Sequence, residues 1–182
     1  MYYIKNYFKK LNLLFNDINF DDVENISKEI LNCKKKGNSV FIFGNGGSAS
    51  IASHVSTDLN KICKVKSKNF NEANHITCFA NDFGYERWVV ETLKIYLKKN
   101  DLVILISSKG NSKNMINAAK FCNKKGVKLI TLTGFDKKNK LKALNKSKKL
   151  NVWINSKTYN FVENLHQIIL LAAIDKISKS KF

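Results

Sequence analysis

The chain alternates between short apolar runs and longer segments in which apolar residues recur at helical spacing. Near-continuous apolar runs rich in β-branched residues predict strands that are covered on both faces of a sheet. The predicted strands are Ser39 to Phe43, His75 to Phe79, Leu102 to Ser107, Val127 to Thr133 and the less apolar Leu150 to Ile154. The predicted helices between them are Ser48 to Lys61, Tyr85 to Lys98, Ser112 to Lys124 and Lys138 to Asn145.

Strands that alternate with helices favour an α/β fold with a parallel sheet and right-handed crossovers. A long amphipathic helix is predicted from Asn160 to Ser178. The N-terminal segment predicts one or two helices that end near Gly37, a residue suited to a helix C-cap. With no proline, no Gly/Ser linker and no repeat, we expect a single domain over 1–182. It divides into an N-terminal helical extension, 1–37, and an α/β core, 38–182.

The composition and the apolar runs indicate whether the chain is folded and in which compartment we expect it. Apolar residues make up 44% of the chain, which argues against a disordered polypeptide. The longest apolar run, Ile168 to Ile174, is too short to span a bilayer, and the N-terminus does not have the pattern of a signal peptide. We therefore expect a cytoplasmic protein, without membrane insertion, whose four cysteines are reduced. Cys78 falls inside a predicted strand and is expected to be buried.

The net charge of +18 raises the question of a polyanionic partner. Short lysine clusters recur along the chain, but they fall at predicted helix ends and loops rather than in one stripe. No helix-turn-helix, zinc-finger or RNA-binding signature accompanies them. We do not expect specific nucleic-acid binding, although a positive field would attract anionic metabolites.

Three polar loops follow predicted strands, and in parallel sheets ligands bind beyond the carboxyl ends of strands. These loops are Gly44 to Ser48, Asn81 to Gly84 and Ser107 to Ser112. Glycines let a backbone approach an anion closely, and the helix that follows offers unpaired N–H groups. Taken singly, each loop could be only a turn and a helix cap. Two such loops at corresponding strand ends favour a phosphate site.

The same loops exclude two nucleotide-binding signatures. Gly44-Asn45-Gly46-Gly47-Ser48 matches neither the Walker A pattern nor the GxGxxG dinucleotide fingerprint. No nucleotide cofactor is therefore expected.

These motifs resemble the sugar isomerase (SIS) domain, and more narrowly the phosphoheptose isomerases. The resemblance rests on Gly44 to Ala49, the helix that carries His54 and Asp58, Asn81 to Gly84, and Ser107 to Ser112. It implies a three-layer fold with a five-stranded, flavodoxin-like parallel sheet. It also implies a homotetramer with active sites at subunit interfaces. The family converts sedoheptulose 7-phosphate to glycero-manno-heptose 7-phosphate through an enediol, for bacterial surface carbohydrate such as lipopolysaccharide.

The resemblance assigns a substrate site and acid–base groups. The expected substrate-binding residues are Asn45, Gly46, Gly47, Ser48, Asp82, Ser107, Ser108, Lys109 and Ser112. The expected catalytic residues are Asp58 as base, with Glu163 or His166 as acid partner. His54 and Asp58 are spaced i, i+4, and Glu163 and His166 are spaced i, i+3, which is a known metal-ligand spacing. These four residues could therefore also hold Zn²⁺.

The chain departs from the family pattern at four of these positions. Asp58 replaces the usual glutamate, and Glu163 replaces a glutamine. Leu171 aligns with the family's catalytic histidine, and Lys109 stands where the family has a serine. Leu171 motivates an alternative function, a non-catalytic sugar-phosphate-binding or regulatory protein. A third hypothesis, direct nucleic-acid binding, rests on charge alone.

Overall fold

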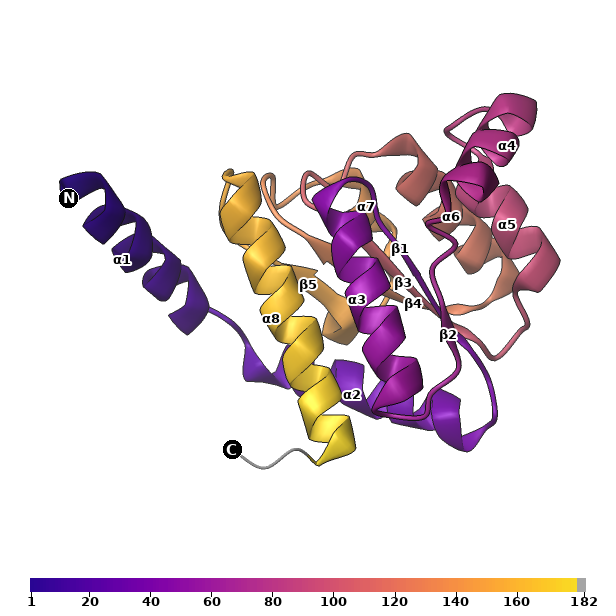
Figure 1. Cartoon of the computed structure of the whole chain (residues 1–182), viewed down its shortest axis with the longest axis horizontal. Helices are drawn as coiled ribbons and strands as arrows, with labels where there is room; N and C mark the ends of the chain where they lie inside the picture. The colour runs from indigo at the N-terminus through magenta and orange to yellow at the C-terminus, as the bar shows by residue number, and fades with distance from the viewer. Residues whose placement is uncertain (180–182) are drawn as a thin grey trace.

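The computed structural model describes residues 1–179, in which a parallel sheet of five strands lies between two layers of helices (Figure 1). The strands are β1 (Val40–Phe43), β2 (Ser67–Lys68), β3 (Leu102–Ser107), β4 (Lys128–Thr133) and β5 (Asn151–Trp153). All neighbours pair in parallel, in the order β2-β1-β3-β4-β5. This is the flavodoxin-like order, so the predicted α/β class is confirmed.

The helices of the described chain connect and cover these strands. They are α1 (Tyr2–Asn16), α2 (Phe20–Lys35), α3 (Gly47–Lys61), α4 (Ala73–Phe83), α5 (Trp88–Tyr96), α6 (Lys113–Lys125), α7 (Lys140–Leu144) and α8 (Tyr159–Ser178), with a 3₁₀ turn, η1 (Lys148–Leu150). Gly37 follows α2 with φ of 69°, so α2 ends where the sequence predicts. Among the described residues, none of these helices is both long enough and apolar enough to cross a bilayer.

Both faces of the sheet are buried, which explains the apolar runs. Val40 and Ile42 of β1 belong to a core shared with α2, α3 and α8. Phe41 and Phe43, which alternate with them, belong to a second core with α5, α6 and α7. Because successive side chains of a strand point to opposite faces, a strand between two helical layers has no solvent face and no need of polar alternation.

The predicted strand over His75 to Phe79 is wrong, because this run lies within helix α4. The strand that pairs with β1 at that edge is the two-residue β2, which the sequence did not reveal. Within α4, His75 and Phe79 lie one turn apart and stack, with ring centroids 4.3 Å apart. His75 Nε2 also lies 2.8 Å from Thr92 Oγ1 of α5. Contacts with α5, available only in three dimensions, decide this segment, and they leave Cys78 exposed instead of buried.

Candidate active site

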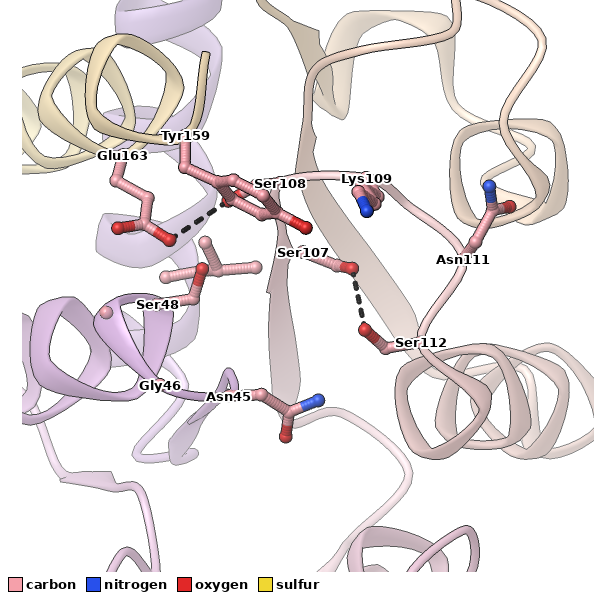
Figure 2. Close-up of a pocket in the computed structure, with 12 residues that line it drawn as sticks. Asn45, Gly46, Ser48, Ser107, Ser108, Lys109, Asn111, Ser112, Tyr159 and Glu163 are labelled. Atoms are coloured by element: carbon pink, nitrogen blue, oxygen red, sulfur yellow. Dashed lines mark hydrogen bonds between the residues drawn. The ribbon is translucent and has the colours of Figure 1, made fainter. Parts of the chain in front are cut away.

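A cavity of about 460 Å³ lies beyond the carboxyl ends of β1 and β3, where the glycine loop and the serine loop meet (Figure 2). Its lining comes from these loops and the start of α8. The lining residues are Asn45, Gly46, Gly47, Ser48, Ile106, Ser107, Ser108, Lys109, Asn111, Ser112, Tyr159 and Glu163. The sequence-predicted substrate residues therefore lie together around one cavity, with the exception of Asp82.

The glycine loop turns sharply from β1 into α3. Gly46 has φ of 53° as the N-cap of α3, a conformation that glycine adopts without strain. Gly47 approaches α8 so closely that a Cβ there would collide with the Glu163 carboxylate. Ser48 is 3% exposed and opens the first turn of α3. Close approach by small residues thus brings the helix N-terminus to the cavity, the arrangement suited to an anion.

The serine loop brings hydroxyl groups to the same cavity. Ser107 Oγ donates to Ser112 Oγ over 3.2 Å, and Ser108 Oγ donates to Glu163 Oε1 over 3.3 Å. At the other end of the loop, Gly110 has φ of 65° and packs against Asn139, leaving no room for a Cβ. The serine hydroxyls are therefore held in place before any ligand binds, at the N-terminus of α6.

Asn45 lines the cavity, but its amide is occupied by protein partners. The side chains of Asn45 and Asn114 exchange two hydrogen bonds, of 3.0 and 2.9 Å. The Tyr85 hydroxyl also donates to Asn45 Oδ1 over 3.0 Å. Asn114 is 2% exposed, so this hydrogen-bonded pair holds the glycine loop against α6. The sequence analysis missed Asn114 and Tyr85, because neither belongs to a recognisable motif.

Aromatic residues surround the exposed Lys109 at the mouth of the cavity. Its Nζ lies 5.3 Å from the ring centroid of Tyr159 and 5.8 Å from that of Phe135, which is cation–π geometry. The two rings contact each other at 4.9 Å. Figure 2 shows the Tyr159 ring extending from α8 between Glu163 and Lys109. The sequence analysis missed Tyr159 as well, because a tyrosine at a helix start carries no motif.

A smaller cavity of about 320 Å³ adjoins the first, and Gly47 and Glu163 line both. His54 lies in this second cavity, between two partners. Its Nε2 is 3.2 Å from Asp58 Oδ2, and its Nδ1 is 3.4 Å from Gln167 Nε2. Asp58 is 21% exposed and lines neither cavity. Its carboxylate contacts the His54 ring, and the His54 ring lines the second cavity.

Two predicted site residues lie away from this arrangement. Asp82 is exposed near the end of α4, where it accepts a hydrogen bond from Asn81, and it does not line the cavity. The reason is that its segment is a helix end rather than a loop after a strand. His166 is fully buried, with Nε2 donating to Thr133 O over 3.1 Å. Burial lowers the pKa of His166 to about 4, so the ring is a neutral core group and does not fit the role of acid partner.

The four residues predicted to hold zinc do not fit that role in the described chain. His54 and Asp58 bind each other, Glu163 binds Ser108, and His166 faces the core. No group of three or more histidine, cysteine, aspartate or glutamate side chains is close enough to ligate a metal ion within residues 1–179. Spacing along two separate helices did not predict which faces of the helices meet.

Comparisons with known proteins agree with this geometry. The SIS domain family matches residues 6–134. Phosphoheptose isomerase from Aliarcobacter butzleri is 35% identical over 64% of this chain and 65% of its own length. The enzyme of the same name from Fusobacterium nucleatum is 30% identical over 88% of this chain and 84% of its own.

The solved structures include phosphoheptose isomerase from Neisseria gonorrhoeae. It superposes with a TM-score of 0.88 at 21% identity and covers 96% of this chain and 97% of its own. At that identity the likeness concerns the fold. The chain spans about two thirds of the length of the Aliarcobacter relative, so what the whole relative does is carried over only as a proposal.

Proposed function

The chain belongs to the SIS domain family, and we propose that it is an aldose–ketose isomerase that converts sedoheptulose 7-phosphate to glycero-manno-heptose 7-phosphate. The observation that carries the proposal is the cavity in which Glu163 faces the two phosphate-binding loops. Its volume of about 460 Å³ lies in the range of pockets for small ligands. The relatives named phosphoheptose isomerase support the choice of sugar.

In this proposal the phosphate lies between the glycine and serine loops. On binding, Ser107 and Ser108 turn their hydroxyl protons from Ser112 and Glu163 to the phosphate oxygens, and Ser112 donates to them as well. The N-termini of α3 and α6 supply a favourable dipole. Lys109 adds a full positive charge at the mouth of the cavity. Phosphate binding thereby fixes the sugar with its carbonyl end toward the second cavity, where Glu163 and His54 lie.

The chemistry requires a proton to leave the carbon next to the carbonyl and to return at the neighbouring carbon. Glu163 and His54 are the titratable groups that line the second cavity, and we assign the two transfers to them. Asp58 acts through His54, because its carboxylate contacts Nε2 and orients the ring. The predicted role of Asp58 as the base itself is therefore revised to a positioning role.

The test is turnover of sedoheptulose 7-phosphate by the purified protein, together with solvent deuterium exchange at the carbon next to the carbonyl. Glu163→Gln should lower kcat at least about 100-fold, because loss of a positioned proton-transfer group costs two to four orders of magnitude. Asp58→Asn should lower kcat as well. Thr57→Ala, an exposed neighbour of Asp58 on α3, is the matched control and should retain activity. A wild-type protein that forms no product and exchanges no proton would refute the isomerase.

The alternative function, a non-catalytic sugar-phosphate-binding protein, has one observation in its favour. Leu171 stands where the resemblance places a catalytic histidine, and it packs partly buried against the core that contains α8. This alternative predicts sugar-phosphate binding by calorimetry without any deuterium exchange. The two readouts on one sample separate the two functions.

We further propose a cytoplasmic homotetramer that serves surface carbohydrate synthesis, from the same resemblance. The proposed isomerisation involves no zinc, because the donor set within residues 1–179 does not fit one. Activity should therefore survive dialysis against EDTA. Loss of activity on chelation, restored by added zinc, would mean that residues of another subunit complete a metal site.

A further inference from the structure

The described part of the chain has a groove larger than the proposed sugar-phosphate cavity. This groove, of about 690 Å³, lies at the opposite end of the sheet, where α5 and α6 end and lead into β3 and β4. Figure 1 shows α5 and α6 side by side over the sheet. This α5–α6 groove is lined by Leu93, Lys94, Leu97, Lys98, Lys99, Phe121, Lys124, Lys125 and Val127. A six-residue strand, β3, separates it from the serine loop, which is about 20 Å at the rise of a parallel strand.

The floor of the groove is apolar and partly aromatic. Leu93 is fully buried and Val127 is 6% exposed, so both belong to the core beneath the groove. Leu97 and Phe121 are half-buried and pack on that core, with one side turned outward. Lys125 Nζ lies 5.8 Å from the Phe121 ring centroid. The floor therefore offers an apolar surface with a cation over its aromatic ring.

The walls of the groove carry more positive charge than is needed to neutralise the negative C-terminal ends of α5 and α6. Lys94 is paired with Glu91 at 2.8 Å, but Lys98, Lys99, Lys124 and Lys125 make no ion pair with any acidic side chain in the described part of the chain. Each helix C-terminus contributes about half a negative charge. The nearby buried Asp101 adds one more, which it directs at two backbone N–H groups. The four lysines without an ion pair carry four positive charges, and the two helix ends and Asp101 together carry about two negative ones. An excess of about two positive charges therefore remains above the apolar floor.

We propose that the α5–α6 groove binds a small molecule that carries two or more phosphates on an aromatic body, the class of nucleoside diphosphates and triphosphates. Its volume is that of a small-ligand pocket. The floor suits a ring stacked on Phe121, and the lysines suit a chain of phosphates. The site is separate from the sugar-phosphate cavity and does not depend on the proposed isomerase activity.

The test is calorimetric titration of the purified full-length protein with ATP, adenosine and tripolyphosphate, in buffer without divalent cations. ATP should saturate at one molecule per chain and bind at least about tenfold more tightly than either fragment. Lys98→Gln combined with Lys124→Gln should weaken ATP binding at least about tenfold. Phe121→Leu should weaken ATP binding while leaving tripolyphosphate binding within about twofold.

The control removes the same charge elsewhere. Lys5→Gln combined with Lys9→Gln lowers the net charge equally on the exposed helix α1 and should change ATP affinity by less than about twofold. Circular dichroism checks that each variant is folded. The proposal is overturned if ATP does not saturate, if tripolyphosphate binds as tightly as ATP, or if the control variant loses as much affinity. Tight binding of a single-stranded RNA with the same lysine dependence, without saturable ATP binding, would overturn it in favour of a nucleic-acid surface.

Discussion

At the mouth of the cavity between the glycine and serine loops, Lys109 is held over Tyr159 and Phe135, each from a different segment of the chain. Phe135 has φ of 54°, a conformation that costs a non-glycine residue about 1–2 kcal/mol. Its N–H donates to Ser156 O over 2.8 Å, which helps to hold that backbone. The strained aromatic residue thus packs against the lysine at a position where the family resemblance leads us to expect a serine.

Lys109→Ser should raise the KM for the sugar phosphate about tenfold and leave kcat within about twofold. The reason is that a charge at the phosphate end stabilises the bound substrate and the transition state alike. Phe135→Leu, which removes this aromatic contact but not the charge, should raise KM less. Lys137→Ser is the matched control, because Lys137 also lies over an aromatic ring, Trp153, but does not line the cavity. Steady-state kinetics measure all four proteins, and a fall in kcat at unchanged KM for Lys109→Ser would contradict the assigned role.

His166 is the residue whose burial most changes the interpretation of the sequence. The ring donates to Thr133 O from Nε2, while Nδ1 has no partner within the described residues. Desolvation is the main cause that lowers its pKa to about 4, against 6.5 for an ordinary histidine. The residue therefore contributes to the core of α8 and β4 rather than to catalysis.

The depressed pKa of His166 predicts a loss of stability in mild acid. Below pH 6.5 the unfolded chain takes up a proton on this histidine while the folded chain does not, until the pH approaches 4. The free energy of unfolding should therefore fall by about 1.5 kcal/mol between pH 6.5 and 5 from this group. His166→Gln keeps a donor for Thr133 O without a titrating ring. Urea denaturation at both pH values should show a smaller fall for His166→Gln, and an equal fall in both proteins would contradict the burial.

At the scale of elements, the turn from β1 into α3 depends on two glycines for different reasons. A Cβ at Gly44 would lie 2.5 Å from the backbone carbonyl of Ser48, in the following helix. The three atoms nearest to a Cβ at Gly47 all belong to the carboxylate of Glu163, at the end of a half-buried side chain. Backbone cannot move away as a side chain can, so the same substitution should have different consequences at the two positions.

Gly44→Ala should lower the free energy of unfolding by about 1–3 kcal/mol, the usual cost of forcing extra volume into a packed region. Gly47→Ala should cost less than about 1 kcal/mol but lower kcat at least about tenfold, because it displaces the proposed proton-transfer group Glu163. Thermal denaturation and kinetics on the two variants separate these effects. Equal stability losses would show that the collision at Gly47 also moves the backbone.

At the scale of the whole molecule, α1 lies at one side of the fold (Figure 1) and packs on it through one face, where the rings of Tyr7 and Phe161 lie 4.6 Å apart. Several of its large apolar side chains are exposed, among them Tyr3 at 75% and Phe8 at 60%. Exposed large apolar side chains gathered on one helix favour an interaction site. A second copy of the chain fits this surface under the proposed tetramer.

Sedimentation should give a particle of four chains, and Tyr3→Glu combined with Phe8→Glu should produce smaller species. The reason is that burying two carboxylates in an apolar contact costs several kcal/mol each. Lys9→Gln, on an exposed position of the same helix, is the control and should leave the mass unchanged. Sedimentation of the wild-type protein as a monomer would contradict the proposed tetramer.

Several features of this protein could be predicted from local sequence. The runs around Val40, Leu102 and Lys128 became strands where expected, because a strand covered on both faces needs apolar residues throughout. The loops 44–48 and 107–112 came together at one cavity, because parallel strands end at the same edge of a sheet. Such features depend on neighbours in sequence or on sheet geometry that holds for any sequence of this class.

Features that depend on which faces of the helices and strands pack together were decided only by the tertiary structure. Five residues from His75 to Phe79 suit a strand or a helix, and contacts with α5 selected the helix. Spacing along α8 placed Glu163 and His166 on one helix, but packing turned Glu163 to the cavity and His166 to the core. The basic groove between α5 and α6 arises in the same way. Helical and strand periods specify elements, whereas the rotation of each element is set by close packing against partners distant in the chain.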